Sequence, residues 1–205
     1  MFFMKKLLLI LIFTLSSQTL TKADDIKDFE IEGVNIGDSL LKHYTKEEIL
    51  NAKTTKFPNS KKFYIIHIKG DSENYDQLSY LVKNNDDNYK IEELSGDKFY
   101  YKPGDDNIEK KHLECLKQKE LITKQFEEIL LVAKKKNYVH KYKSVDDGKS
   151  ISAITDFEFK DSSAIRIYCN KFTKETINKN FYFNGLSVSI TPFKIFNFLN
   201  NEAYK

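Results

Sequence analysis

Arginine is almost absent from this chain, which contains Arg166 and no other. Arginine is the side chain that binds phosphates and base edges through two parallel hydrogen bonds. The net charge of +3 arises entirely within residues 1–23, which hold Lys5, Lys6 and Lys22 and no acidic residue. The remainder, with 30 acidic residues and an equal number of basic ones, carries no net charge. We therefore expect no nucleic-acid partner.

The chain also lacks the motifs that mark metal and catalytic sites. Its four histidines are scattered, and its 2 cysteines form no Cys-x-x-Cys pair, so nothing argues for a metal site. There is no Gly-x-Ser-x-Gly elbow. Gly148-Lys149-Ser150 matches the end of a phosphate-binding loop, but Lys143 stands where that loop requires glycine. The sequence therefore predicts no cofactor and identifies no catalytic residue.

The first 23 residues have the pattern of an export signal. Lys5 and Lys6 precede an apolar run at 7–13, and Thr21 and Ala23 suit cleavage before Asp24. The run is shorter than the about 20 apolar residues that span a bilayer, and no cysteine follows it to carry a lipid. We expect a signal peptide at 1–23 and a periplasmic or secreted protein. No linker rich in Pro, Gly or Ser divides residues 24–205, which we expect to form a single domain.

Hydrophobic periodicity predicts an α+β fold. Apolar residues alternate over 29–34. After this stretch, Asp38 is expected to cap a short turn, and Thr45 with Glu48 is expected to form a capping box. Strands are expected at 63–68, 78–82, 89–94, 138–143, 151–159, 164–169 and 186–190. Thr191-Pro192 opens a last helix with Phe193, Phe196 and Leu199 on its apolar face, and 173–180 is ambiguous. We expect an antiparallel sheet of about six to seven strands with the helices on one face, and a loose pseudo-repeat.

The longest expected helix runs from about residue 105 to about residue 136. The apolar residues of this helix and Cys115 form one stripe, which Lys119 interrupts. Lys134, Lys135 and Lys136 would complete the last turn of the helix. Cys169 shares a strand face with Ile165 and Ile167, so both cysteines point into the layer between helix and sheet. Export favours a disulfide between Cys115 and Cys169. The alternatives are two buried free thiols or a thiol nucleophile beside a histidine.

A polar group is expected on the hairpin formed by residues 151–169. If Asp161, Ser162 and Ser163 form its turn, Phe157 faces Ile167, Glu158 faces Arg166, and Asp156 faces Tyr168. The side chains that would share the polar side are Asp156, Glu158, Arg166 and Tyr168. They are either a ligand site with acid–base residues or a cross-strand ion pair on a solvated sheet face, which is the commoner arrangement.

Four parts of the chain carry a resemblance to known proteins. The segments "DFEIEGVNIGDSLL", "AIRIYC" and "FLNNEAYK", with Cys115 on the long helix, resemble a group of exported proteins from marine alphaproteobacteria with small, AT-rich genomes. The resemblance covers nearly all of residues 24–205. It implies a shared fold and export, and brings no activity, cofactor or catalytic residue.

Two functions are compatible with these patterns. The first is a soluble periplasmic, non-catalytic module that binds an unknown protein or small ligand or associates with the envelope. The alternative is a periplasmic, hydrolase-like enzyme in which Asp156 or Glu158 works beside Arg166. A carboxyl group with a perturbed pKa in a deep cleft would favour the enzyme, and a solvated sheet face would favour the binding module.

Overall fold

The computed structural model describes residues 25–70, 72–101, 107–180 and 183–204, so the signal peptide expected at 1–23 lies outside the described residues. The secondary-structure elements, in chain order, are η1 (Ile26–Asp28), β1 (Glu30–Ile31), β2 (Val34–Asn35), η2 (Leu40–Lys42), α1 (Lys46–Asn51), β3 (Lys53–Lys56), β4 (Phe63–Lys69), β5 (Gln77–Lys83), β6 (Ile91–Tyr101), α2 (Ile108–Ile129), β7 (Lys134–Lys141), α3 (Lys143–Asp146), β8 (Ile151–Glu158), β9 (Ala164–Lys171), α4 (Lys174–Asn180), β10 (Asn184–Thr191) and α5 (Phe193–Asn201).

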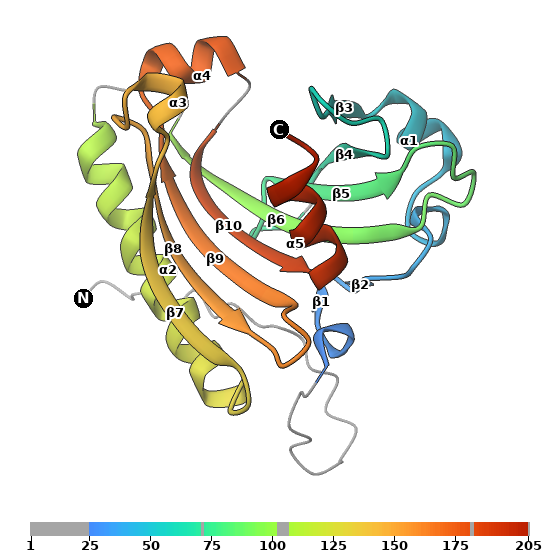
Figure 1. Cartoon of the computed structure of the whole chain (residues 1–205), viewed down its shortest axis with the longest axis horizontal. Coiled ribbons are helices and arrows are strands. Elements are labelled where there is room, and N and C mark those ends of the chain that lie inside the picture. The colour runs from blue at the N-terminus through green and yellow to red at the C-terminus, as the bar shows by residue number, and fades with distance from the viewer. Residues whose placement is uncertain (1–24, 71, 102–106, 181–182, 205) are drawn as a thin grey trace, which may run out of the picture.

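One eight-stranded sheet organises the molecule, in the order β3-β4-β5-β6-β10-β9-β8-β7 (Figure 1). All of its strand pairs are antiparallel, which confirms the expected α+β class. The sheet has more strands than expected partly because β3, with the sequence Lys-Thr-Thr-Lys, has no apolar residue to reveal it. A separate small hairpin joins β1 to β2.

The sheet consists of two halves with the same element order. In the first half α1 precedes β3, β4, β5 and β6, and in the second α2 precedes β7, β8, β9 and β10, with α3 and α4 inserted. The last strands of the two halves, β6 and β10, pair with each other at the centre of the sheet. The pseudo-repeat is therefore present in the topology, where hydrogen bonds between β6 and β10 join the two halves.

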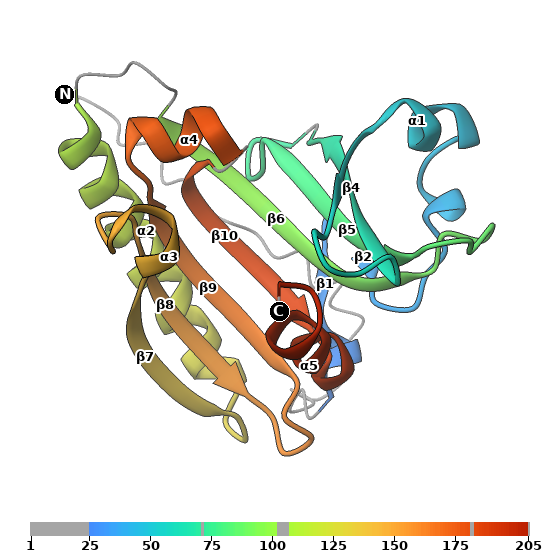
Figure 2. The same ribbon diagram turned by 45° about the horizontal axis from the view of Figure 1, so that its top comes forward.

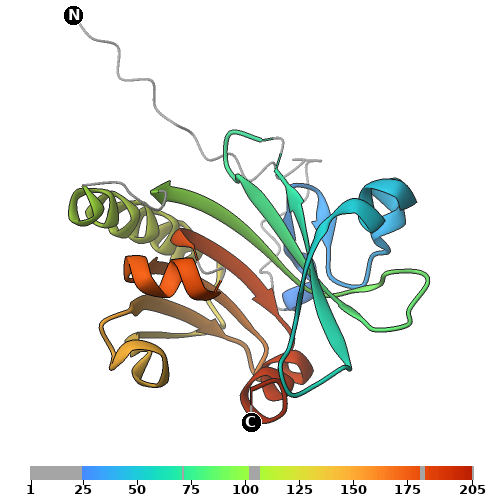
Figure 3. The same cartoon turned by 90° about the horizontal axis from the view of Figure 1, so that it is seen from above.

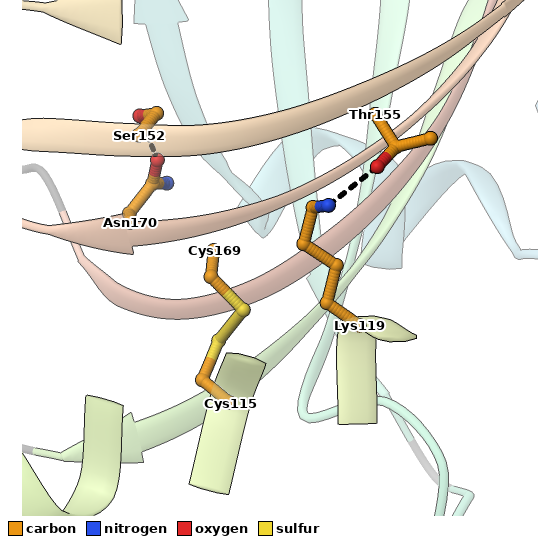
Figure 4. Close-up of a disulfide and its surroundings, with 6 residues drawn as sticks. All are labelled: Cys115, Lys119, Ser152, Thr155, Cys169 and Asn170. Carbon is orange, nitrogen blue, oxygen red and sulfur yellow. Dashed lines mark hydrogen bonds between the residues drawn. A yellow bond between two sulfur atoms is a disulfide. The ribbon is translucent and has the colours of Figure 1, made fainter. Parts of the chain in front are cut away.

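One face of the sheet packs against α2 and carries the main core. Figure 3 shows the sheet as an arch with α2 on its outer side. Ile165, Ile167 and Cys169 of β9 lie in this core with Cys115 of α2. The expected disulfide is confirmed: Cys115 and Cys169 are bonded, with 6.0 Å between their Cα atoms (Figure 4). Lys119, which interrupts the apolar stripe, donates a hydrogen bond to the hydroxyl of Thr155 on β8.

The opposite, inner face of the arch carries α5. Ile195 and Phe198 of this helix pack with Phe57, Phe63 and Leu81 in a second, smaller core. The expectation that all helices share one face is therefore wrong for α5. Its apolar stripe is also displaced from the expected one: Phe193 is 52% exposed and Leu199 is only partly buried. Pro192, rather than Thr191, occupies the N-cap position. Thr191 is instead the last residue of β10, and its hydroxyl donates to Glu93 at 2.7 Å.

The opening stretch is a hairpin and two capped turns. Glu32 and Gly33, with φ angles of 53° and 75°, form a two-residue turn that divides the expected alternation into β1 and β2. Ser39, rather than Asp38, caps η2 by accepting from the Leu41 amide at 3.2 Å. The capping box is confirmed, since the Glu48 amide donates to Thr45 Oγ1 at 3.2 Å and Glu48 accepts from the Thr45 amide.

The long helix ends earlier than its periodicity indicates. It stops at Ile129, and Lys134, Lys135 and Lys136 begin β7 instead of completing its last turn. The whole of β7 pairs with β8, from Lys134 opposite Glu158 to Lys141 opposite Ile151. The ladder supplies backbone hydrogen bonds from a distant strand, which helical periodicity cannot reveal. The ambiguous segment at 173–180 contains α4.

Candidate functional site

The inner face of the sheet is polar along its central strands. Successive side chains of a strand point to opposite faces, so residues that alternate with the main core face the inner side. We call the following set the polar face: Gln77, Ser79, Glu93, Ser95, Asp97, Asp156, Arg166, Tyr168, Ser187, Ser189 and Thr191. Figures 1 and 2 show α4 towards one end of these strands and α5 at the other, with β10 and β9 between them.

Arg166 forms the most constrained polar group of this face. Its Nε and Nη2 donate to the two carboxylate oxygens of Asp156 at 2.7 and 3.0 Å, and the Tyr138 hydroxyl donates to Asp156 Oδ2 at 2.9 Å. Nη2 also donates to the Tyr138 hydroxyl at 3.0 Å, and the ring centroid of Phe196 on α5 lies 5.4 Å from Arg166 Cζ. Two-pronged pairing of this kind fixes orientation as well as charge. Arg166 is therefore held rigidly, with its charge balanced by Asp156.

The structure brings together only some of the residues expected on the hairpin at 151–169. Asp156 pairs with Arg166, whereas Glu158 lies opposite Ala164 and binds Lys136. The expected register was wrong by two residues, because the connection comprises residues 159–163 rather than three residues. An even displacement keeps every side chain on its expected face. Tyr168 accordingly lies on the polar face, but opposite Ile154 and Ser187 instead of Asp156.

A second polar network, which sequence reasoning missed, lies around Asp97. Asp97 is only 3% exposed and accepts hydrogen bonds from Ser187 at 2.6 Å, Ser79 at 2.9 Å and Gln77 at 3.2 Å. Ser79 Oγ also lies 2.9 Å from Nδ1 of His67. The available signal was the polar residue at every second position of β5, β6 and β10. Which of these residues meet depends on strand order, and β6 and β10 are far apart in the chain.

This network contains serine, histidine and aspartate without the geometry of a catalytic triad. In a triad the histidine lies between the hydroxyl and the carboxylate, so that the carboxylate orients the general base. Here Ser79 lies between His67 and Asp97, and Nε2 of His67 meets the Thr55 hydroxyl at 2.9 Å. Ser79 donates its proton to Asp97, and Nδ1 of His67 also lies 3.2 Å from the Gln77 amide nitrogen, which can only donate; the carboxylate of Asp97 makes no contact with the imidazole among the hydrogen bonds of the described residues. The network thus satisfies buried polar groups and does not activate Ser79.

Burial changes the pKa of several groups on this face. It raises the pKa of Glu93 to about 6, although the hydrogen bond from Thr191 and the charge of Arg166 oppose the change. Burial likewise raises the pKa of Asp97 against its three hydrogen bonds. For His67, burial, with a smaller effect of Lys53, lowers the pKa to about 4. His67 is therefore neutral at pH 7.

We expect His67→Gln to alter the pH dependence of stability. Between its ordinary pKa of 6.5 and about 4, His67 takes up a proton in the unfolded chain but not in the folded protein. Stability is therefore lost as pH falls through this window. Glutamine cannot take up that proton, so the variant should lose about 1–2 kcal/mol less than the wild type. Urea unfolding at pH 6.5 and pH 4 measures the difference, and identical pH dependence in the two proteins would contradict it. The raised pKa of Glu93 makes the free energy of unfolding increase as pH falls. This contribution is the same in both proteins, so the difference between them reports His67.

Among the described residues, no group of three or more His, Cys, Asp or Glu side chains is placed to hold a metal ion. In the same part of the chain, no helix has the length and apolar character needed to cross a membrane. No family model, curated protein or solved structure matches the chain.

Proposed function

We propose that this protein is an exported, non-catalytic binding module that uses the polar face of its sheet to engage a partner protein in the periplasm or envelope. The disulfide between Cys115 and Cys169 supports export, because disulfides persist in oxidising compartments and are rare in the cytosol. The signal peptide expected at 1–23 agrees with this location.

The observation that carries the proposal is the rigid group formed by Arg166, Tyr138 and Phe196. Residues that dominate protein–protein binding are enriched in Tyr and Arg and are surrounded by contacts that exclude water. Tyr138 is 40% exposed, and Asp156 and Phe196 hold the guanidinium beside it in place. Groups that are already ordered lose little conformational entropy when a partner binds.

The extent of the polar face favours a protein over a small ligand. The inner face of the sheet, which contains the polar face, carries polar side chains from His67 on β4 to Tyr138 on β7, six strand spacings apart. At about 4.8 Å per spacing this distance is about 29 Å. A standard protein interface buries about 800 Å² on each partner, which corresponds to a square about 28 Å on a side. Along the arched sheet, the width of the inner face therefore matches that of a protein interface. The side chains of this face that remain accessible include the exposed Tyr138 and the partly exposed Gln77, Glu93, Ser95, Arg166 and Tyr168.

Site-specific photocrosslinking in cells that export the protein tests this proposal. A benzophenone side chain at Tyr138 should give an adduct of defined mass, and Phe196→Ala should reduce its yield. Val139 is the matched control, because it is the next residue of the same strand, is 56% exposed and faces the other side of β7. The same adducts from both positions, or an adduct from neither, would overturn the proposal.

Hydrolysis is the second candidate function, and the pKa of Glu93, at about 6, favours it. A carboxyl group that titrates near neutral pH can serve as a general acid or base. The two carboxylates that the sequence suggests for this role are engaged in ion pairs, Asp156 with Arg166 and Glu158 with Lys136. An activity of the purified protein on nitrophenyl esters or glycosides that Glu93→Gln abolishes and Glu158→Gln preserves would select the enzyme.

A further inference from the structure

A cavity of about 230 Å³ lies between the second half of α2 and the sheet, apart from the polar face. Segment 29–31 closes one side, and β9 and β10 form its floor. Its apolar lining comprises Phe29, Ile31, Tyr75, Ile122, Phe126, Ile129, Ile165, Val188 and Ile190. Native cores contain few voids larger than a water molecule, so a cavity of this size between helix and sheet is a candidate binding site.

The size of the cavity sets the size of its occupant. An engineered apolar cavity of about 150 Å³ stays dry and binds benzene. By the same proportion, about 230 Å³ accommodates a hydrocarbon group of about eight or nine carbon atoms. One wall is the ring of Tyr75, which lies against Gly96 where a Cβ would come within 2.6 Å of the ring. Glycine at position 96 thus makes room for this wall.

The rim of the cavity indicates the charge of the occupant. The polar residues at its rim are Glu30, Gln125 and Glu128, all exposed to solvent, and no basic side chain is found among the described residues that line it. Two carboxylates at the mouth favour a cation and disfavour an anion, and the amide of Gln125 can either donate or accept a hydrogen bond. An apolar interior with an acidic mouth is complementary to an amphiphile with a positively charged head.

We propose that this cavity binds a small cationic amphiphile, with a hydrocarbon group of about eight carbons in the apolar interior and an ammonium group beside Glu30 and Glu128. The observations behind this site are independent of those behind the polar face, so either proposal can fail while the other stands. Burial of the hydrocarbon supplies the favourable free energy, and the carboxylates supply the preference for charge.

Isothermal titration calorimetry with octylammonium, octanol and octanoate tests the proposal on the purified protein. Octylammonium should bind saturably, and about tenfold more tightly than octanoate at low salt. That preference should shrink as salt is added, because exposed charges are screened. The double variant Glu30→Gln with Glu128→Gln should bring the two affinities to within about threefold while leaving octanol unchanged. Glu120→Gln with Glu127→Gln is the matched control on α2, since neither residue lines the cavity.

Filling the cavity provides a second test. Ile129→Trp, at the partly buried edge of the lining, should abolish binding of all three probes. Leu121→Trp places the same side chain on the exposed side of α2, where Leu121 is 56% exposed, and should leave binding intact. The proposal would be overturned by absence of saturable octylammonium binding, by unchanged binding in a folded Ile129→Trp variant, or by an ammonium preference that survives loss of both carboxylates.

Discussion

Replacing Cys115 and Cys169 together by alanine should lower the free energy of unfolding by about 4 kcal/mol. The disulfide closes a loop with a sequence separation of 54 between α2 and β9. On the chain-entropy model this constraint removes conformations mainly from the unfolded chain. Both cysteines are fully buried in the main core, and alanine at the two positions introduces no polar group there. Urea unfolding of the oxidised protein and of the double variant measures the difference.

Two controls separate the contribution of the disulfide bond to stability from the effect of replacing the two side chains. Unfolding in the presence of a reductant should bring the wild type close to the double variant, because both chains then lack the cross-link. Thiol titration of protein denatured without reductant should find no free thiol in a monomer. Two free thiols per chain, or equal stability of the oxidised protein and the double variant, would contradict the prediction.

Arg166→Ala should cost about 2–3 kcal/mol of stability, which is less than a fully buried ion pair would cost because the guanidinium is partly exposed. Removing the arginine leaves the carboxylate of Asp156, whose side chain is 9% exposed, with the Tyr138 hydroxyl as the one side-chain donor left to it among the described residues. An ion pair on a solvated sheet face, as the sequence alone suggested, would contribute less than about 1 kcal/mol. Denaturant unfolding distinguishes the two values.

The loss of stability expected for each matched variant depends on whether a charged partner remains unpaired. Arg166→Met combined with Asp156→Leu removes both charges, so it should be less destabilising than Arg166→Ala, which leaves one charge unpaired. Lys136→Ala removes the partner of the more exposed Glu158 and should cost under about 0.5 kcal/mol. If Arg166→Ala and Lys136→Ala had equal, small effects, the arrangement around Asp156 would not be the rigid group described.

The hairpin at 151–169 shows how far sequence reasoning reached at the candidate site. Alternation placed Phe157, Ile165 and Cys169 on the core side and Arg166 on the other, because side-chain direction repeats every two residues. It could not determine the register, since connections of three and of five residues preserve the same faces. That difference decided that Asp156, rather than Glu158, binds Arg166.

By itself the sequence determined the features that short segments carry: the faces of the central strands, the capping box at Thr45, and the placement of both cysteines in one layer. The tertiary structure decided which distant segments meet. It paired β6 with β10, recruited Lys134, Lys135 and Lys136 into β7, and placed His67, Asp97 and Tyr138 on one face. The physical reason is that capping and alternation depend on neighbouring residues. Strand order instead depends on packing and loop closure summed over the whole chain.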